Sequence, residues 1–258
     1  MKNRTKLHIA PLLACLLAAG ASLSAQTIAS WDFNGIDLDN LDPANNHELA
    51  AGSTAEGIAQ VTLRLGPGVN HTTASGQYGF KIPNADAQNS LAGAIASDHY
   101  IEFTLTAAPG GSLNLNSLEF NGQSAATGAD NIALLSSVGG FTESAAIVTR
   151  SNIAGSTGGF DTDNSGFGGP IDLSAAEYQN IASVTFRLYG WNTSGSTGAT
   201  YLRNLSGDDL VIHGTASVPE PASASLLTGG LALLGLLARG GMKRPSCLTY
   251  NLTSKAVR

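Results

Sequence analysis

Charged side chains are scarce in this chain. They make up 12% of its 258 residues, about half of the ~25% that is usual in globular proteins. This scarcity, together with 43% hydrophobic residues, excludes a nucleic-acid-binding tail, a coiled coil and a highly charged disordered chain. The abundant residues are instead 31 Gly with many Ser, Thr and Asn, which is typical of a globular β protein with many turns.

Cysteine is almost absent. The chain has two cysteines, Cys15 and Cys247, and both lie near its ends. Residues 26–216 contain none, so this region is not a disulfide scaffold and must be stabilised by burial of a hydrophobic core. A stretch of about 190 residues is long enough to form such a core.

Basic residues are rare between the two ends. Three of the 13 Lys and Arg lie in residues 1–25 and five in residues 239–258, which leaves five against all 19 Asp and Glu. The stretch between the ends therefore has a net charge of −14. Nucleic acids and anionic membranes repel such a region, so we expect no nucleic-acid partner and a tolerance for cations or neutral polymers.

The N-terminus has the three parts of a secretory signal peptide. Three basic residues within residues 1–6 precede an apolar run over 7–21 and a small-residue stretch that ends at Ala25. We predict a signal peptide over residues 1–25, cleaved after Ala25. A lipoprotein signal with lipidated Cys15 is the alternative, but the apolar run continues well beyond this cysteine.

A second apolar segment lies near the C-terminus. Residues 222–238 carry no charge, and the basic Arg239, Lys243 and Arg244 follow them. Seventeen residues are just enough for a transmembrane helix, whose basic end stays in the cytoplasm while the preceding domain lies outside. A buried core helix is the alternative, and the basic cluster argues against it. Residues 245–258 are expected to be an unstructured basic tail.

A short proline motif precedes this segment. Val218, Pro219, Glu220 and Pro221 alone predict a stiff, extended linker. Together with the apolar segment and the basic cluster, residues 217–244 resemble the PEP-CTERM sorting signal of bacterial exported proteins, which is also catalogued as the C-terminal domain of some ice-binding proteins. The resemblance implies recognition by an exosortase-type membrane transpeptidase, removal of the span and transfer to the cell surface or extracellular matrix, often beside an exopolysaccharide system.

The region over residues 26–216 has the pattern of an antiparallel β-sandwich. In residues 99–106 and 183–189, apolar and polar side chains alternate, which predicts strands with one buried and one wet face. Eight further strands are expected at 28–33, 60–65, 77–82, 112–120, 131–136, 145–149, 200–205 and 209–213, and one short helix at 174–179. We predict an all-β, jelly-roll-like sandwich.

Three segments of this region carry a looser resemblance. The Trp31-Asp32-Phe33 strand, VTFRLYGW at residues 184–191 and RNLSGDDLVIHG at residues 203–214 resemble secreted β-sandwich domains that are joined to PEP-CTERM signals. That resemblance implies no established catalytic or binding activity.

Catalytic motifs are missing from the exported region. Its histidines are His47, His71, His99 and His213, without a G-x-S-x-G turn or an H-E-x-x-H helix. We therefore expect a protein that is not an enzyme. A carbohydrate-active enzyme remains the alternative, since the spacing of paired carboxylates is a property of the fold.

One acidic loop has the spacing of a calcium loop. When Asp161 is counted as position 1, oxygen-bearing side chains stand at positions 1, 3, 5 and 12, which are Asp161, Asp163, Ser165 and Asp172. Glycine stands at position 6, and the carbonyl group of Phe167 at position 7 is a further candidate ligand. The loop is a candidate structural calcium site, and an ordinary Asp/Asn/Gly loop is the alternative. A second acidic stretch, 37–42, lacks the glycine and is predicted to form a solvated loop or an Asx turn.

Two tryptophans bear on sugar binding. Trp31 lies in the first predicted strand and is expected in the core, whereas Trp191 follows a strand and is a candidate stacking platform for a sugar ring.

The first hypothesis for the function is an exported, non-enzymatic surface or matrix protein that binds envelope polysaccharide. The alternatives are a secreted carbohydrate-active enzyme and an ice- or surface-adsorbing module.

The sorting signal makes the first testable prediction. If residues 218–244 are recognised by a transpeptidase, Glu220→Ala removes the charged residue of the motif, and the precursor should stay in the membrane fraction with its tail uncleaved. Mass spectrometry and fractionation of the full chain measure this. Unchanged maturation of the variant would contradict the sorting interpretation and leave the span intact.

Overall fold

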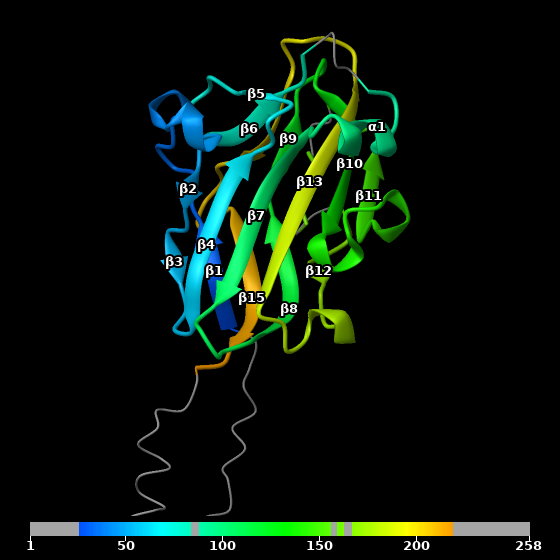
Figure 1. Ribbon diagram of the computed structural model, residues 1–258. Helices are drawn as coiled ribbons and strands as arrows, with labels where there is room; N and C mark the ends of the chain where they lie inside the picture. The colour runs from blue at the N-terminus through cyan, green and yellow to red at the C-terminus, as the bar shows by residue number, and fades with distance from the viewer. Residues whose placement is uncertain (1–25, 84–87, 156–158, 163–166, 219–258) are drawn as a thin grey trace, which may run out of the picture. The chain divides into compact units, whose positions relative to one another are not determined.

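The computed structural model describes residues 26–83, 88–155, 159–162 and 167–218 (Figure 1). The predicted signal peptide, the apolar segment 222–238 and the tail 245–258 lie outside these ranges, as does the sorting motif apart from Val218. Within them, no helix has both the length and the apolar character needed to cross a membrane. The compact unit that contains the sheets ends at Val218.

The described residues form an all-β structure. The strands are β1 (Gln26–Trp31), β2 (Leu49–Ala50), β3 (Ser53–Thr54), β4 (Ile58–Leu65), β5 (Asn70–His71), β6 (Gln77–Lys81), β7 (Tyr100–Ala107), β8 (Leu113–Phe120), β9 (Gly122–Ser124), β10 (Ala129–Ser136), β11 (Val148–Ser151), β12 (Ile171–Asp172), β13 (Ser183–Thr193), β14 (Ala199–Arg203) and β15 (Leu210–Ala216). All ten predicted strands coincide wholly or in part with observed ones, and the five that the pattern missed are only two or three residues long.

The helix prediction was confirmed only in part. Residues 174–179 contain only a single 3-10 turn, Ala176–Tyr178, and the one α-helix in the described residues is α1 (Leu91–Ala96). Helix α1 begins after Ser90, whose hydroxyl accepts a hydrogen bond from the Gly93 amide at 3.1 Å. Six residues are too few to show a helical period in the sequence.

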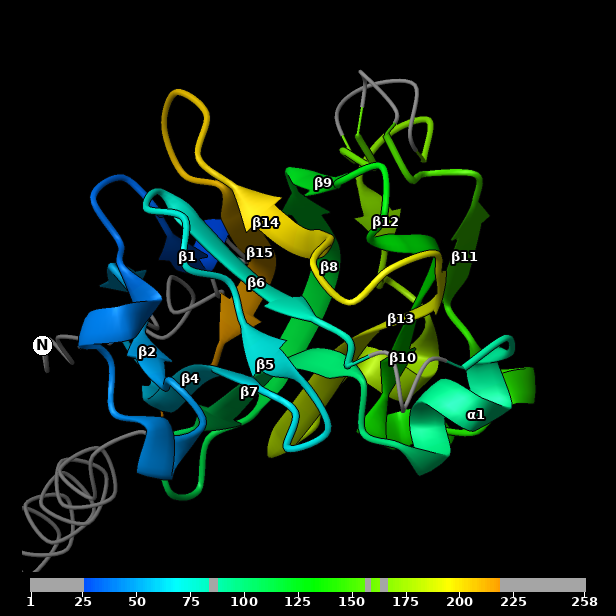
Figure 2. The ribbon, with the colours of Figure 1, turned by 90° about the horizontal axis from the view of Figure 1, so that it is seen from above.

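The strands pair into three antiparallel sheets. One sheet has the order β12-β8-β15-β1-β3, the second β11-β10-β13-β7-β4-β2 and the third β5-β6-β14-β9. In Figure 1 the six-stranded sheet lies in front of the five-stranded sheet, and the four-stranded sheet lies at the upper end of both. Figure 2 looks down on that end, so the four-stranded sheet is nearest the viewer. The first strand, β1, pairs with the last, β15, so the chain closes on itself.

One apolar core joins the three sheets. Trp31 of the five-stranded sheet meets Phe103 of the six-stranded sheet with ring centroids 6.5 Å apart. Phe33, just after β1, stacks on Tyr78 of the four-stranded sheet at 6.0 Å. This arrangement is consistent with the predicted β-sandwich, and the compact unit that holds the core ends at Val218. We therefore expect residues 26–218 to fold on their own.

A glycine at the junction of β8 and β9 has no room for a side chain. A Cβ on Gly122 would lie 1.9 Å from a ring carbon of Phe160, which is fully buried. Gly122→Ala must push this ring aside and should destabilise residues 26–218 by about 1–3 kcal/mol. Gly52→Ala is the control, because its Cβ would meet only the Ser30 carbonyl oxygen at 3.7 Å. Equal urea midpoints for the two variants would contradict this packing.

Candidate functional site

The six-stranded sheet has one face in the core, and its opposite face is polar where β4, β7 and β13 lie side by side, while its part over β10 and the end of β13 is covered by an apolar cluster with α1. Ile101, Phe103 and Leu105 of β7 join the core, so the side chains between them lie on the opposite face, which we call the outer face. The outer face carries three rows of side chains across β4, β7 and β13. They are the charged row Arg64–Glu102–Arg187, the hydroxyl row Thr62–Thr104–Thr185 and a third row Gln60–Thr106–Ser183.

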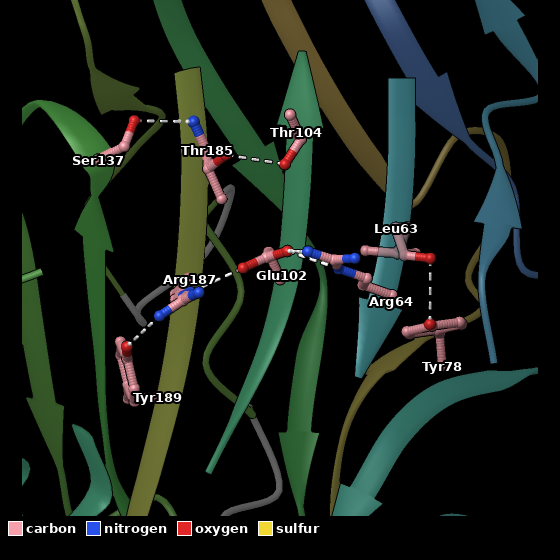
Figure 3. Close-up of polar contacts among 9 residues, drawn as sticks. All are labelled: Leu63, Arg64, Tyr78, Glu102, Thr104, Ser137, Thr185, Arg187 and Tyr189. Atoms are coloured by element: carbon pink, nitrogen blue, oxygen red, sulfur yellow. Dashed lines mark hydrogen bonds and ion pairs between the residues drawn. The ribbon is translucent and has the colours of Figure 1, made fainter. Parts of the chain in front are cut away.

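Glu102 is the centre of the charged row (Figure 3). Its side chain is 2% exposed, and a guanidinium group contacts it from each neighbouring strand. Glu102 Oε1 accepts hydrogen bonds from Arg64 Nε at 2.6 Å and Nη2 at 2.5 Å. Its Oε2 accepts one from Arg187 Nε at 2.7 Å. Both carboxylate oxygens are therefore bound by cations.

Aromatic rings hold Arg187 on the other side. Its guanidinium carbon lies 4.2 Å from the ring centroids of both Tyr100 and Phe141, and its Nη1 donates to the Tyr189 hydroxyl at 3.3 Å. Each cation–π contact of this kind stabilises by roughly 0.5–2 kcal/mol. Arg187 is thus fixed in place, while Arg64 at the other end of the row is 46% exposed and accessible to a ligand.

The surroundings of Arg187 keep its guanidinium group charged. Burial opposes the charge of Arg187, but hydrogen bonds to Tyr189 and Glu102 outweigh it, so the pKa of Arg187 is raised. Burial raises the pKa of Tyr100 to about 12 and raises that of Tyr189 as well. Catalytic acids and bases need a pKa near the working pH, so Arg187, Tyr100 and Tyr189 are suited to recognition rather than proton transfer.

The hydroxyl row is also internally bonded (Figure 3). Thr104 Oγ1 and Thr185 Oγ1 are 2.8 Å apart, and the Thr185 amide donates to Ser137 Oγ at 3.0 Å. In the third row, the Thr106 and Ser183 hydroxyls are 3.0 Å apart. Neighbouring strands lie roughly 4.8 Å apart, so the hydroxyl groups form a regular array on a sheet.

The candidate stacking residue Trp191 lies inside a strand. Strand β13 continues through Thr193, and Trp191 packs under α1 beside Leu91 and Leu135 with 8% of its surface exposed. A ring so enclosed presents little area to a sugar. Trp31 is in the core, as expected, with 1% exposed.

Residues of the predicted calcium loop are only partly described. Asp163 and Ser165 lie outside the described residues. Asp161 accepts a hydrogen bond from the Gly122 amide at 2.8 Å and forms an ion pair with Arg203. Asp172 accepts from the Ser174 amide at 2.8 Å, and Phe167 packs edge-on against Phe120. An ion at Asp161 would compete with Arg203, and the calcium site stays a prediction.

The other acidic stretch behaves as predicted. Asp37 Oδ1 accepts from the Asp39 amide at 3.1 Å and Asp42 Oδ1 from the Ala44 amide at 2.9 Å, which are Asx turns. His71 Nε2 lies 2.6 Å from Asp39 Oδ1, and its ring is 4.3 Å from that of His47. Across the described part of the chain, no group of three or more His, Cys, Asp or Glu side chains could hold a metal ion.

Two carboxylates share a surface groove. The groove has a volume of about 520 Å³ and is lined by Asp172 and Glu177 together with Val138, Ala146 and Tyr178. A hydrogen bond from the backbone of Ser174 lowers the pKa of Asp172, which keeps this carboxylate ionised. The acid of a glycosidase lies in an apolar environment, whereas both of these side chains are exposed.

Sequence reasoning missed the charged row, although part of its signal is visible. The alternation in residues 99–106 and 183–189 places Glu102 and Arg187 on the wet face of their strands. It does not show that β4 and β13 flank β7, which is what brings Arg64 and Arg187 to the same carboxylate. No family model, curated protein or solved structure matches this chain.

The charged row predicts unequal effects of its members on stability. Glu102→Gln leaves two guanidinium groups without their anion and should destabilise residues 26–218 by about 2–3 kcal/mol, less than a fully buried pair because both arginines reach solvent. Arg64→Ala should cost under ~1 kcal/mol, because this side chain is half-exposed. Urea unfolding measures both, and a Glu102→Gln variant as stable as Arg64→Ala would contradict the proposed importance of this carboxylate.

Proposed function

We propose that this chain is an exported, non-enzymatic protein of the cell surface or extracellular matrix, and that the outer face of its six-stranded sheet binds a neutral envelope polysaccharide. The signal peptide, the membrane span and delivery by an exosortase-type transpeptidase belong to the same proposal, as does a jelly-roll-like sandwich. The support for export comes from the sequence of the two ends, and the support for binding comes from the outer face.

The observation that carries the binding proposal is the fixed charged row beside a regular hydroxyl row. Internal hydrogen bonds hold Glu102, Arg187, Thr104 and Thr185 before any ligand arrives, so little conformational entropy is lost on binding. The exposed Arg64 offers charged donors to sugar hydroxyls. A neutral polymer suits the domain better than an anionic one, because the region between the two ends has a net charge of −14.

Two alternatives each rest on one feature. The groove lined by Asp172 and Glu177 favours a carbohydrate-active enzyme, since it brings two carboxylates to one hollow. The hydroxyl row favours an ice- or surface-adsorbing module, since it presents threonines at regular spacing. Assays of reducing-sugar release and of thermal hysteresis separate them from polysaccharide binding.

Affinity electrophoresis of residues 26–218 through gels containing dextran, a neutral polysaccharide, tests the proposal. Arg64→Ala should weaken retardation about tenfold, as expected for loss of one hydrogen bond from a charged donor. Arg150→Ala is the matched control, because Arg150 pairs with the core-facing Ile132 and lies on the other face of the same sheet.

Three outcomes would contradict the proposal. Equal retardation of the Arg64→Ala and unmutated proteins would remove the outer face as the binding surface. Release of reducing sugar, lost in Glu177→Gln, would favour the enzyme. Thermal hysteresis without dextran binding would favour the adsorbing module.

A further inference from the structure

The tripeptide Phe-Asn-Gly occurs twice in this chain, as Phe33-Asn34-Gly35 and as Phe120-Asn121-Gly122. An Asn–Gly pair can react with itself, because the backbone nitrogen of the glycine can attack the side-chain amide carbon of the asparagine. Glycine has no side chain that hinders this approach. The two tripeptides are identical, so a difference in their reactivity comes from the structure around them.

The first pair forms an exposed turn after β1. The Ile36 amide donates to the Phe33 carbonyl oxygen at 3.1 Å, and of the two central residues only Gly35 has a positive φ, 75°, which is the geometry of a type II turn. Asn34 and Gly35 are both exposed, and a Cβ on Gly35 would meet no other part of the described chain within 4 Å. This reactive pair is therefore open to solvent.

The peptide group between Asn34 and Gly35 is held at neither of its polar atoms within the described residues. No described donor bonds the Asn34 carbonyl oxygen, and no described acceptor bonds the Gly35 amide. Type I and type II turns differ by a rotation of this central peptide group, and glycine at the third position permits both. The rotation that brings the Gly35 nitrogen toward the Asn34 side chain consequently breaks no hydrogen bond of that peptide group.

The second pair is held at the same two atoms. The Gly122 amide donates to Asp161 Oδ1 at 2.8 Å, and the Asn121 carbonyl oxygen accepts from the Arg203 amide at 2.9 Å. Gly122 is also buried in β9. Rotation of this peptide group would break both hydrogen bonds, so Asn121 can react only after local unfolding.

We propose that Asn34 is a site of spontaneous deamidation and that the fold protects Asn121 from the same reaction. The Gly35 nitrogen forms a bond to the side-chain carbon of Asn34. The side-chain nitrogen leaves as ammonia and takes the proton of the Gly35 nitrogen, which leaves a five-membered succinimide ring. Water then opens the ring at either carbonyl and gives aspartate or isoaspartate at position 34.

The modification would change a turn that connects two sheets. Phe33 stacks on the four-stranded sheet, and its amide donates to Asp209 Oδ2 at 2.8 Å. On the other side of the turn, the Ile36 carbonyl oxygen accepts from the Gly76 amide at 2.7 Å. Both products add a carboxylate between these anchors, and isoaspartate also lengthens the backbone by one methylene. This inference goes beyond the proposed function, because it concerns another site and needs no ligand.

Incubation of folded residues 26–218 at mildly alkaline pH in water enriched in ¹⁸O tests the proposal, with peptide mass spectrometry as the readout. Asn34 should acquire one heavy oxygen as it converts to aspartate and isoaspartate, which chromatography separates. Asn121 should convert at least about tenfold more slowly, because it reacts only through local opening. Asn34→Gln, whose longer side chain cannot form the five-membered ring, should abolish the change at position 34 and leave the rate at Asn121 as it was.

The same chain unfolded in guanidinium chloride is the matched control. Unfolding removes the hydrogen bonds at Asn121 and leaves two identical tripeptides, so both asparagines should then convert at similar rates. Equal conversion of the two in the folded protein would overturn the proposal. So would a folded chain in which Asn34 stays intact while it converts in the unfolded one.

Discussion

The alternation of side chains along β7 and β13 is the constraint on which the rest of this structure depends. Every second residue of these strands enters a core that no disulfide supports, and the residues between them are thereby placed on one outer surface. A shift of the register by one residue would bury Arg187 and expose Phe186. Core burial therefore determines where the polar side chains of the outer face lie.

The ion pairs of Glu102 on the outer face further fix the register of these strands. A carboxylate with 2% of its side chain exposed is costly unless cations pair with it, and the two arginines that do so come from the strands on either side. The charged row consequently joins β4, β7 and β13 in one register. The four-stranded sheet has a different arrangement, in which Gly79 allows Tyr201 of the neighbouring strand to approach closely.

Much of the fold could be predicted from the sequence, because alternation is a local property. Ile101, Phe103 and Leu105 identify a strand and its buried face without any knowledge of its neighbours. Pairing is not local: β4 and β7 are adjacent although β6, which lies between them in the chain, belongs to another sheet. The charged row depends on that pairing and could not be found from sequence.

Trp191 and Tyr201 show the same limit for single residues. Trp191 was predicted at a loop edge, but β13 extends past it and α1, which is too short to be seen as a pattern, encloses the ring. Tyr201 lies in a predicted strand, and it pairs closely with Gly79, which is more than 120 residues away in the chain but directly opposite in the sheet. Exposure of an aromatic ring is a tertiary property and has no local signal.

The central claim is that the outer face of the six-stranded sheet binds a polysaccharide. Amide chemical shifts of ¹⁵N-labelled residues 26–218, titrated with dextran oligosaccharides, test it most directly because they locate the contact without any substitution. The account predicts that the largest shifts fall on β4, β7 and β13 around Arg64, Thr104 and Thr185. Shifts centred on Asp172 and Glu177, or no shifts in the folded protein, would contradict it.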